Sequence, residues 1–159
     1  MIFMSCGSQL PFPRLVDMMQ AWADQHPDTE VIVQAGEHDF ISSTMKVHKS
    51  LDQQEFVKLI ATCEVFISHA GMGNIITALE LGTPLLIVPR RATLGEHRND
   101  HQIDTAERFG KYPGVAVATD LPELMAQVDS LRHGSRSASA EASPEKEKLL
   151  NAVRSFVST

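Results

Sequence analysis

The stretch from Val65 to Arg90 constrains the fold more strongly than any other part of the chain. It opens with VFIS, an apolar run that is too short and too β-branched for a helix. The glycine-containing segment HAGMGN follows, and apolar residues then recur at helical spacing up to a second apolar run, LLIV. This order predicts a buried strand, a glycine turn, a helix and a second buried strand.

The glycine turn has the features of an anion site. Gly71 and Gly73 allow the backbone to approach a ligand closely, and Asn74 is placed to cap the helix that follows. Because the first N–H groups of a helix lack internal acceptors and carry the positive end of its dipole, a phosphate can dock there. A tight turn that binds no ligand is the alternative, and residues elsewhere must decide between the two.

Apolar runs and helical patterns alternate along the rest of the chain. Further strands are predicted at residues 1–6, 30–34, 44–48 and 115–118. Further helices are predicted at residues 13–26, 53–63, 97–110, 121–128 and 144–157. Strands that alternate with helices form parallel sheets with right-handed crossovers. We therefore expect an α/β fold, with a Rossmann-like parallel sheet and helices on both of its faces.

The sequence predicts one domain followed by a separate helix. A length of 159 residues suits one domain. Residues 133–143, HGSRSASAEAS, are small, polar and aperiodic, as linkers are. We therefore assign residues 1–132 to the Rossmann-like domain, residues 133–143 to a flexible linker and residues 144–159 to a C-terminal helix, whose apolar face needs a surface to cover it.

Composition and charge argue against several functions. A formal charge of −6 with scattered lysines and arginines disfavours nucleic-acid binding. Cys6 and Cys63 lie among apolar residues, which favours buried, reduced thiols in a cytoplasmic protein. The opening MIFMSCGS lacks a basic leader, and no apolar run reaches the roughly 20 residues that span a bilayer. We expect a cytoplasmic protein that reaches any membrane substrate through a partner or a surface contact.

Polar segments are expected at one edge of the sheet, because ligands of such folds bind beyond the carboxyl ends of the strands. The segments are residues 7–9, 35–39, 69–74 and 90–102. Gly7 and Ser8 offer donors, and His69 could hydrogen-bond a phosphate or a backbone carbonyl. Positive charge could come from three loop arginines, unless they are simply solvated. These are Arg90, Arg91 and Arg98.

The densest polar cluster is GEHRNDHQ at residues 95–102. His97 and His101 are four residues apart, as a zinc-binding pair on a helix would be. Because no third ligand is evident, we expect no metal site. Asp100, His101 and Gln102 could instead contact the hydroxyls of a sugar, for which carboxylate and amide groups are suited.

The residues from Ser68 to Arg90, together with NDHQ, the opening strand and GSQLPF, resemble a known family. Over residues 1 to about 130 the chain resembles the C-terminal, donor-binding domain of glycosyltransferase family 28. Within that family it is most similar to the small catalytic subunits of two-component bacterial exopolysaccharide and capsule glycosyltransferases. The resemblance implies one half of a GT-B fold and an inverting, metal-independent transfer from a UDP-sugar to a lipid-linked glycan acceptor, without a cofactor.

The resemblance also assigns residues to the site. It implies that His69 and Asn74 are catalytic and that Gly71, Met72 and Gly73 hold the diphosphate with them. Asp100, His101 and Gln102 would face the sugar. The remaining substrate-binding residues implied at this edge of the sheet are Gly7, Ser8, Gln9 and Arg90.

The resemblance leaves the ribose contact open. Many relatives place a glutamate for the ribose hydroxyls five residues before the glycine that corresponds to Gly82, and this chain has Thr77 there. Glu80 lies almost one turn further along the helix. Either Thr77 makes a single hydrogen bond, or Glu80 reaches the ribose, or the ribose is held differently.

The acceptor-binding half of the family does not accompany these motifs. We therefore expect a membrane-associated partner subunit that supplies the acceptor site, recruits the chain to the inner face of the plasma membrane and packs against the C-terminal helix. The alternative is a non-catalytic module that binds a nucleotide-sugar or stabilises its partner. A GT-B-like sugar epimerase and a metal-dependent hydrolase that uses His97 and His101 are weaker alternatives.

Overall fold

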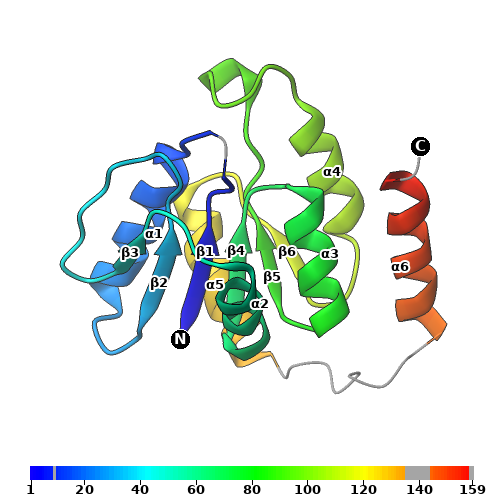
Figure 1. The fold of residues 1–159 in the computed structure, drawn as a ribbon, viewed down its shortest axis with the longest axis horizontal. Coiled ribbons are helices and arrows are strands. Elements are labelled where there is room, and N and C mark those ends of the chain that lie inside the picture. The colour runs from blue at the N-terminus through cyan, green and yellow to red at the C-terminus, as the bar shows by residue number, and fades with distance from the viewer. Residues whose placement is uncertain (9, 135–143, 158–159) are drawn as a thin grey trace.

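A six-stranded, wholly parallel sheet forms the centre of the molecule (Figure 1). The computed structural model describes residues 1–8, 10–134 and 144–157. The strands are β1 (Ile2–Ser5), β2 (Val31–Gln34), β3 (Lys46–His48), β4 (Val65–Ser68), β5 (Leu85–Ile87) and β6 (Val115–Val117), in the order β3-β2-β1-β4-β5-β6. The helices are α1 (Pro13–Gln25), α2 (Gln53–Thr62), α3 (Met72–Leu81), the short 3₁₀ helix η1 (Ala92–Leu94), α4 (His101–Phe109), α5 (Leu121–His133) and α6 (Pro144–Val157). The expected Rossmann-like α/β fold is confirmed.

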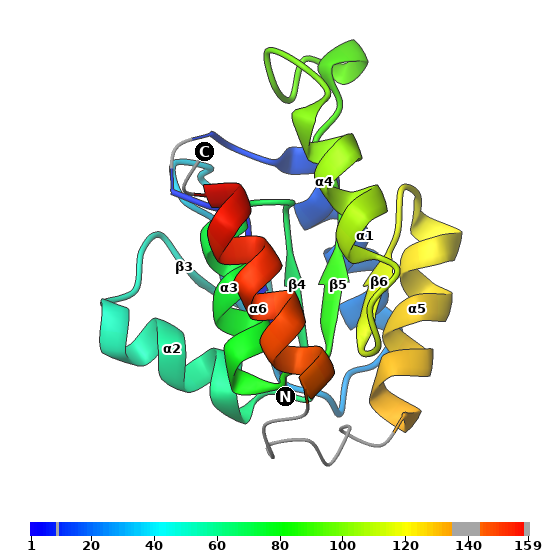
Figure 2. The same cartoon turned by 90° about the vertical axis from the view of Figure 1, so that its right-hand side faces the viewer.

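Helices cover both faces of the sheet, because alternate residues of each strand point to opposite faces. Ile2 and Met4 of β1 pack with α1 and α5, whereas Phe3 between them packs with α2, α3 and α4. Figure 2 shows α1 and α5 on one side of the sheet and α2 and α3 on the other. The core between the sheet and helices α1 and α5 is the first core layer, and the core beneath α2, α3 and α4 is the second core layer. Trp22 is fully buried in the first core layer, and Cys6 and Cys63 are buried free thiols.

Two predicted helix starts were wrong. The helix predicted from residue 97 begins only at His101, because the side chains of Glu96 and Asp100 accept the backbone N–H groups of Arg91 and Ala92 and stabilise a loop. Asn74 does not cap α3. Gly71 occupies the N-cap position, and Asn74 lies within the first helical turn.

The C-terminal helix packs on its own chain. It lies against α3 (Figures 1 and 2), where Leu150 contacts the second core layer and Arg154 donates a 3.4 Å hydrogen bond to Glu80. Residues 135–143, most of the predicted linker, lie outside the described residues, so the assignment of 133–143 as a linker stays a prediction. Among the described helices, none combines the length and apolar character needed to cross a membrane.

The burial of β4 in the core can be tested by substitution. Ile67 of β4 is 0% exposed, so Ile67→Ala should lower the free energy of unfolding by about 2–5 kcal/mol, because it removes buried methylene groups and leaves a cavity. Ile41→Ala is the matched control, since Ile41 is 98% exposed and should change stability by less than about 0.5 kcal/mol. Urea unfolding measures both, and equal effects would contradict the assignment of β4 to the core.

Candidate functional site

Three polar side chains lie next to one another where the central strands end. The strand register pairs Ser5 of β1 with Gln34 of β2 on one side and with Ser68 of β4 on the other. All three are buried. The sequence interpretation did not single out any of them, although each is the polar last residue of an otherwise apolar run: IFMS, VIVQ and VFIS. They form a polar floor at the carboxyl edge of the sheet, where ligands of such folds bind.

A cleft of about 300 Å³ opens above this floor. Its lining residues are Ser5, Gly7, Ser8, Gln34, Leu51, Gln53, Phe56, His69, Gly71, Gly73 and Asn74. Leu51 and Phe56, from the loop before α2 and from α2 itself, provide apolar surface, while α3 contributes its N-terminus. The cleft therefore combines an apolar wall with a group of backbone and amide donors.

The N-terminus of α3 is open to an anion. Its first helical hydrogen bond runs from the Ile75 N–H to the Gly71 carbonyl at 3.1 Å, so the N–H groups of Met72, Gly73 and Asn74 have no acceptor within the helix. The first turn of α3 contains no acidic residue. Backbone donors and the positive end of the dipole thus face the same cleft.

His69 lies between two glycines. A Cβ atom on Gly7 would come within 2.8 Å of the Cε1 atom of the ring, and a Cβ atom on Gly71 would overlap Nε2. Gly7 also has a φ of +83°, which L-residues with side chains rarely adopt. The glycines of two separate sequence motifs are therefore both required by the imidazole ring that they enclose.

The imidazole of His69 is neutral at physiological pH. Burial, with the positive charge of Arg90 as a second cause, lowers the pKa of His69 from 6.5 to about 4, and a hydrogen bond with the Ser5 backbone opposes this shift only in part. A neutral ring offers one N–H donor and one acceptor. It can bind a ligand by hydrogen bonds but is a poor proton acceptor at neutral pH.

A second hollow of about 240 Å³ lies on the other side of the site. Its lining residues are Cys6, Gly7, Ser8, Leu10, His69, Arg90, His97 and Gln102. The Gln102 Oε1 atom accepts the backbone N–H groups of Ala70 at 3.2 Å and Arg90 at 3.0 Å. Gln102 thereby joins the loop after β4 to the loop after β5, and its amide nitrogen is left to interact with a ligand.

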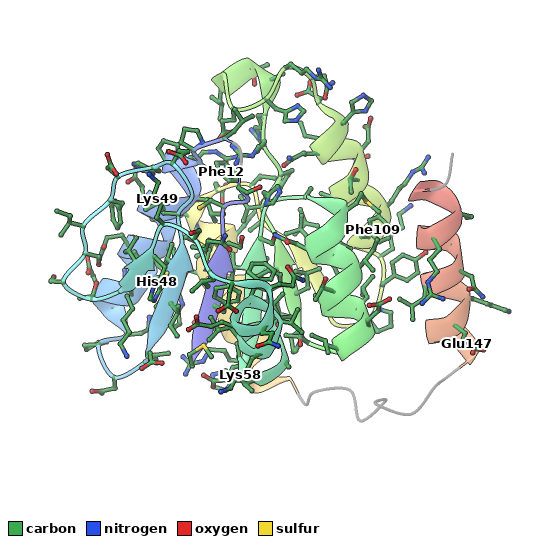
Figure 3. The ribbon with its side chains drawn as sticks, in the orientation of Figure 1. Phe12, His48, Lys49, Lys58, Phe109 and Glu147 are labelled. Atoms are coloured by element: carbon green, nitrogen blue, oxygen red, sulfur yellow. The ribbon has the colours of Figure 1, made fainter. Side chains whose placement is uncertain are left out.

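Arg90 holds the loop between β1 and α1. Its guanidinium donates to the carbonyls of Cys6 at 2.7 Å, Leu10 at 2.7 Å and Pro11 at 2.8 Å, and the residue is 2% exposed. The guanidinium also lies 4.5 Å from the ring centroid of Phe12, which Figure 3 places at the same edge of the sheet. The structure shows Arg90 bonded to this loop, which carries Gly7 and Ser8, instead of pointing freely into the cleft.

Other predicted site residues lie outside both hollows. Thr77 donates to the Gly73 carbonyl, and Glu80 is exposed and bonded to Arg154. Asp100 accepts the Ala92 N–H, and His101 is exposed. Met72 also lines neither hollow and packs partly buried against the second core layer, and Gln9 lies outside the described residues.

The two histidines considered for a metal site lie in different environments. His97 lines the second hollow, whereas His101 is exposed at the start of α4. Across residues 1–8, 10–134 and 144–157, no three His, Cys, Asp or Glu side chains gather in a group that could hold a metal ion.

Comparison with known families identifies the domain. The model of the glycosyltransferase family 28 C-terminal domain matches residues 1–156, almost the entire chain. The chain belongs to this family. A curated relative, the UDP-N-acetylglucosamine transferase subunit ALG13 of Cryptococcus neoformans, is 38% identical to this family 28 domain over 73 residues. That match covers 43% of the chain and 34% of the relative, so the two share only about a third of the relative's length.

Solved structures support the fold. An NMR structure of ALG13 superposes on this family 28 domain with a TM-score of 0.58 at 19% identity, covering 94% of both chains. A UDP-glucose:anthocyanidin 3-O-glucosyltransferase in complex with UDP gives a TM-score of 0.64 at 12% identity, covering 97% of this chain and 35% of that chain. The family 28 domain thus has the fold of one part of a longer glycosyltransferase, which confirms the expected half of a GT-B fold.

The lowered pKa of His69 generates a prediction about acid stability. Unfolded His69 takes up a proton below its ordinary pKa of 6.5, but the folded protein resists protonation down to about 4, so acid favours the unfolded state in this window. From about pH 7 to about pH 5, the wild-type protein should lose about 2 kcal/mol more stability than His69→Gln. His133→Gln, which changes an exposed histidine, should behave as wild type in urea unfolding. Parallel curves for wild type and His69→Gln would contradict the buried, neutral imidazole.

Proposed function

We propose that the chain is the donor-binding subunit of an inverting, metal-independent glycosyltransferase. It binds a UDP-sugar, and a separate membrane-associated partner brings a lipid-linked glycan acceptor during synthesis of exopolysaccharide or another cell-surface polysaccharide. The observation that carries this proposal is the open N-terminus of α3 beside the neutral ring of His69 in one cleft.

The diphosphate of the donor binds at the start of α3. The backbone N–H groups of residues 72–74 and the side chains of Asn74, Ser8 and His69 supply donors there. In a transfer without a metal, such fixed donors stabilise the negative charge that develops on the leaving diphosphate. Because these donors are held by the fold, they need little rearrangement during the reaction.

The remaining parts of the donor bind in the two hollows, the nucleoside in the cleft and the sugar in the second hollow. Leu51 and Phe56 give the nucleobase an apolar surface in the cleft, and the amides of Gln34 and Gln53 meet the ribose hydroxyls. The sugar occupies the second hollow, where the Gln102 amide nitrogen donates to its oxygens. His69 borders both hollows, so it lies beside the bond that breaks.

The partner subunit supplies the general base. Among the described residues, the lining of the two hollows contains no carboxylate, and His69 with a pKa of about 4 is too weakly basic to activate an acceptor hydroxyl efficiently. The same observation favours one alternative, a non-catalytic module that binds the nucleotide-sugar for its partner. The curated relative's name, a transferase subunit, supports dependence on a partner in either case.

Donor binding is tested by calorimetric titration of the purified chain with UDP, with and without EDTA. UDP should bind equally well in both conditions, and Asn74→Ala should weaken binding about tenfold because it removes a donor to the diphosphate. Asn151→Ala, an exposed asparagine on α6, serves as the matched control and should bind as wild type. Absence of UDP binding, or its loss in EDTA, would overturn the proposal.

Reconstitution with the membrane-associated partner distinguishes the catalytic subunit from the non-catalytic module. Sugar transfer by the pair should fall at least about tenfold with His69→Ala, while assembly of the two subunits stays unchanged. Transfer by the partner alone at the rate of the pair would support the non-catalytic module instead.

A further inference from the structure

Ser68 is a buried hydroxyl beneath the cleft. It is the last residue of β4, is 0% exposed and follows three apolar residues in the strand. Burying a hydroxyl costs free energy unless hydrogen bonds compensate. The partners of this hydroxyl therefore indicate why a serine occupies a position where an apolar side chain would continue the strand.

The Ser68 hydroxyl is next to both side chains that the site depends on. The Asn74 Nδ2 atom donates to its Oγ atom at 2.9 Å. The His69 Nδ1 atom lies 3.5 Å from the same oxygen, at the outer limit of a hydrogen bond. The contact with His69 is between adjacent residues, whereas the contact with Asn74 joins the end of β4 to the first turn of α3 across the glycine turn.

We propose that Ser68 is a positioning residue that fixes the amide of Asn74 and the ring of His69 in the cleft. Its role as part of a donor site rests on the proposed function. With Asn74 donating to Oγ, the serine proton is free to point toward His69 Nδ1, which then acts as an acceptor. His69 then carries its single proton on Nε2, and this N–H is also the donor for the hydrogen bond with the Ser5 backbone.

The same hydrogen bond orients Asn74. Its amide nitrogen carries two hydrogens, and Ser68 engages one of them. The second remains available to a ligand in the cleft, in a direction set by the first. Ser68 therefore determines which donors the cleft presents without touching the ligand itself, since the hydroxyl lies outside the lining residues of both hollows.

The test compares Ser68→Ala with Ser68→Thr, which retains the hydroxyl, and with Thr83→Val as the matched control. Thr83 is also buried and donates to the Ile60 carbonyl at 2.7 Å, but it precedes β5 at the opposite end of the sheet. Two measurements are made on the ligand-free protein, the ¹⁵N chemical shifts of the His69 ring, which report its tautomer, and the side-chain amide signals of Asn74. A third is the affinity for UDP.

Ser68→Ala should shift the His69 ring from the Nε2–H tautomer toward a mixture, move the Asn74 amide signals and weaken UDP binding about tenfold. Ser68→Thr should restore all three readouts, and Thr83→Val should change only thermal stability. If Ser68→Ala leaves the His69 and Asn74 signals as in wild type, the positioning role is overturned. If wild type fails to bind UDP while these signals shift, the proposed function fails and the positioning role stands.

Discussion

The site depends on one buried cation. Arg90 follows β5, and its guanidinium donates to carbonyls of the loop after β1, including that of Cys6, which is 84 residues away in sequence. A buried charge is tolerated only where hydrogen bonds replace its water, and this loop supplies them. The loop in turn carries Gly7, whose backbone encloses the ring of His69. Without Arg90, three carbonyls would lose their donor and one wall of the cleft would lose its support.

The same cation influences the chemistry. Its charge adds to burial in keeping His69 neutral. The carboxylate of Glu96 interacts favourably with Arg90 but lies outside the two hollows, whose described lining residues include no carboxylate. Binding power in the cleft therefore comes from backbone N–H groups, side-chain amides, the Ser8 hydroxyl and the neutral ring of His69, all of them uncharged. Such a surface suits a negatively charged ligand, because the fixed dipoles of these groups stabilise the negative charge of the ligand.

The amino-acid pattern was sufficient to predict the sheet, the helices and the glycine turn, because each depends on local periodicity and on the conformational freedom of glycine. It was insufficient for Ser5, Gln34 and Ser68, since their importance arises from strand register, which joins residues far apart in sequence. The role of Arg90 was missed for the same reason. An arginine in a polar loop gives no local sign that its partners are carbonyls on another loop.

The position of Glu80 on α3 bears on how a ribose could be held. Only the first turn of α3 reaches the cleft, through Gly71, Gly73 and Asn74. Glu80 lies seven residues beyond Gly73, about 10 Å along the helix axis, and is bonded to Arg154 of α6. The Glu80 carboxylate would have to give up its bond to Arg154 and span about two helical turns to reach a ribose in the cleft. The amides of Gln34 and Gln53 already line the cleft, so a ribose bound there would meet β2 and α2 before the far end of α3.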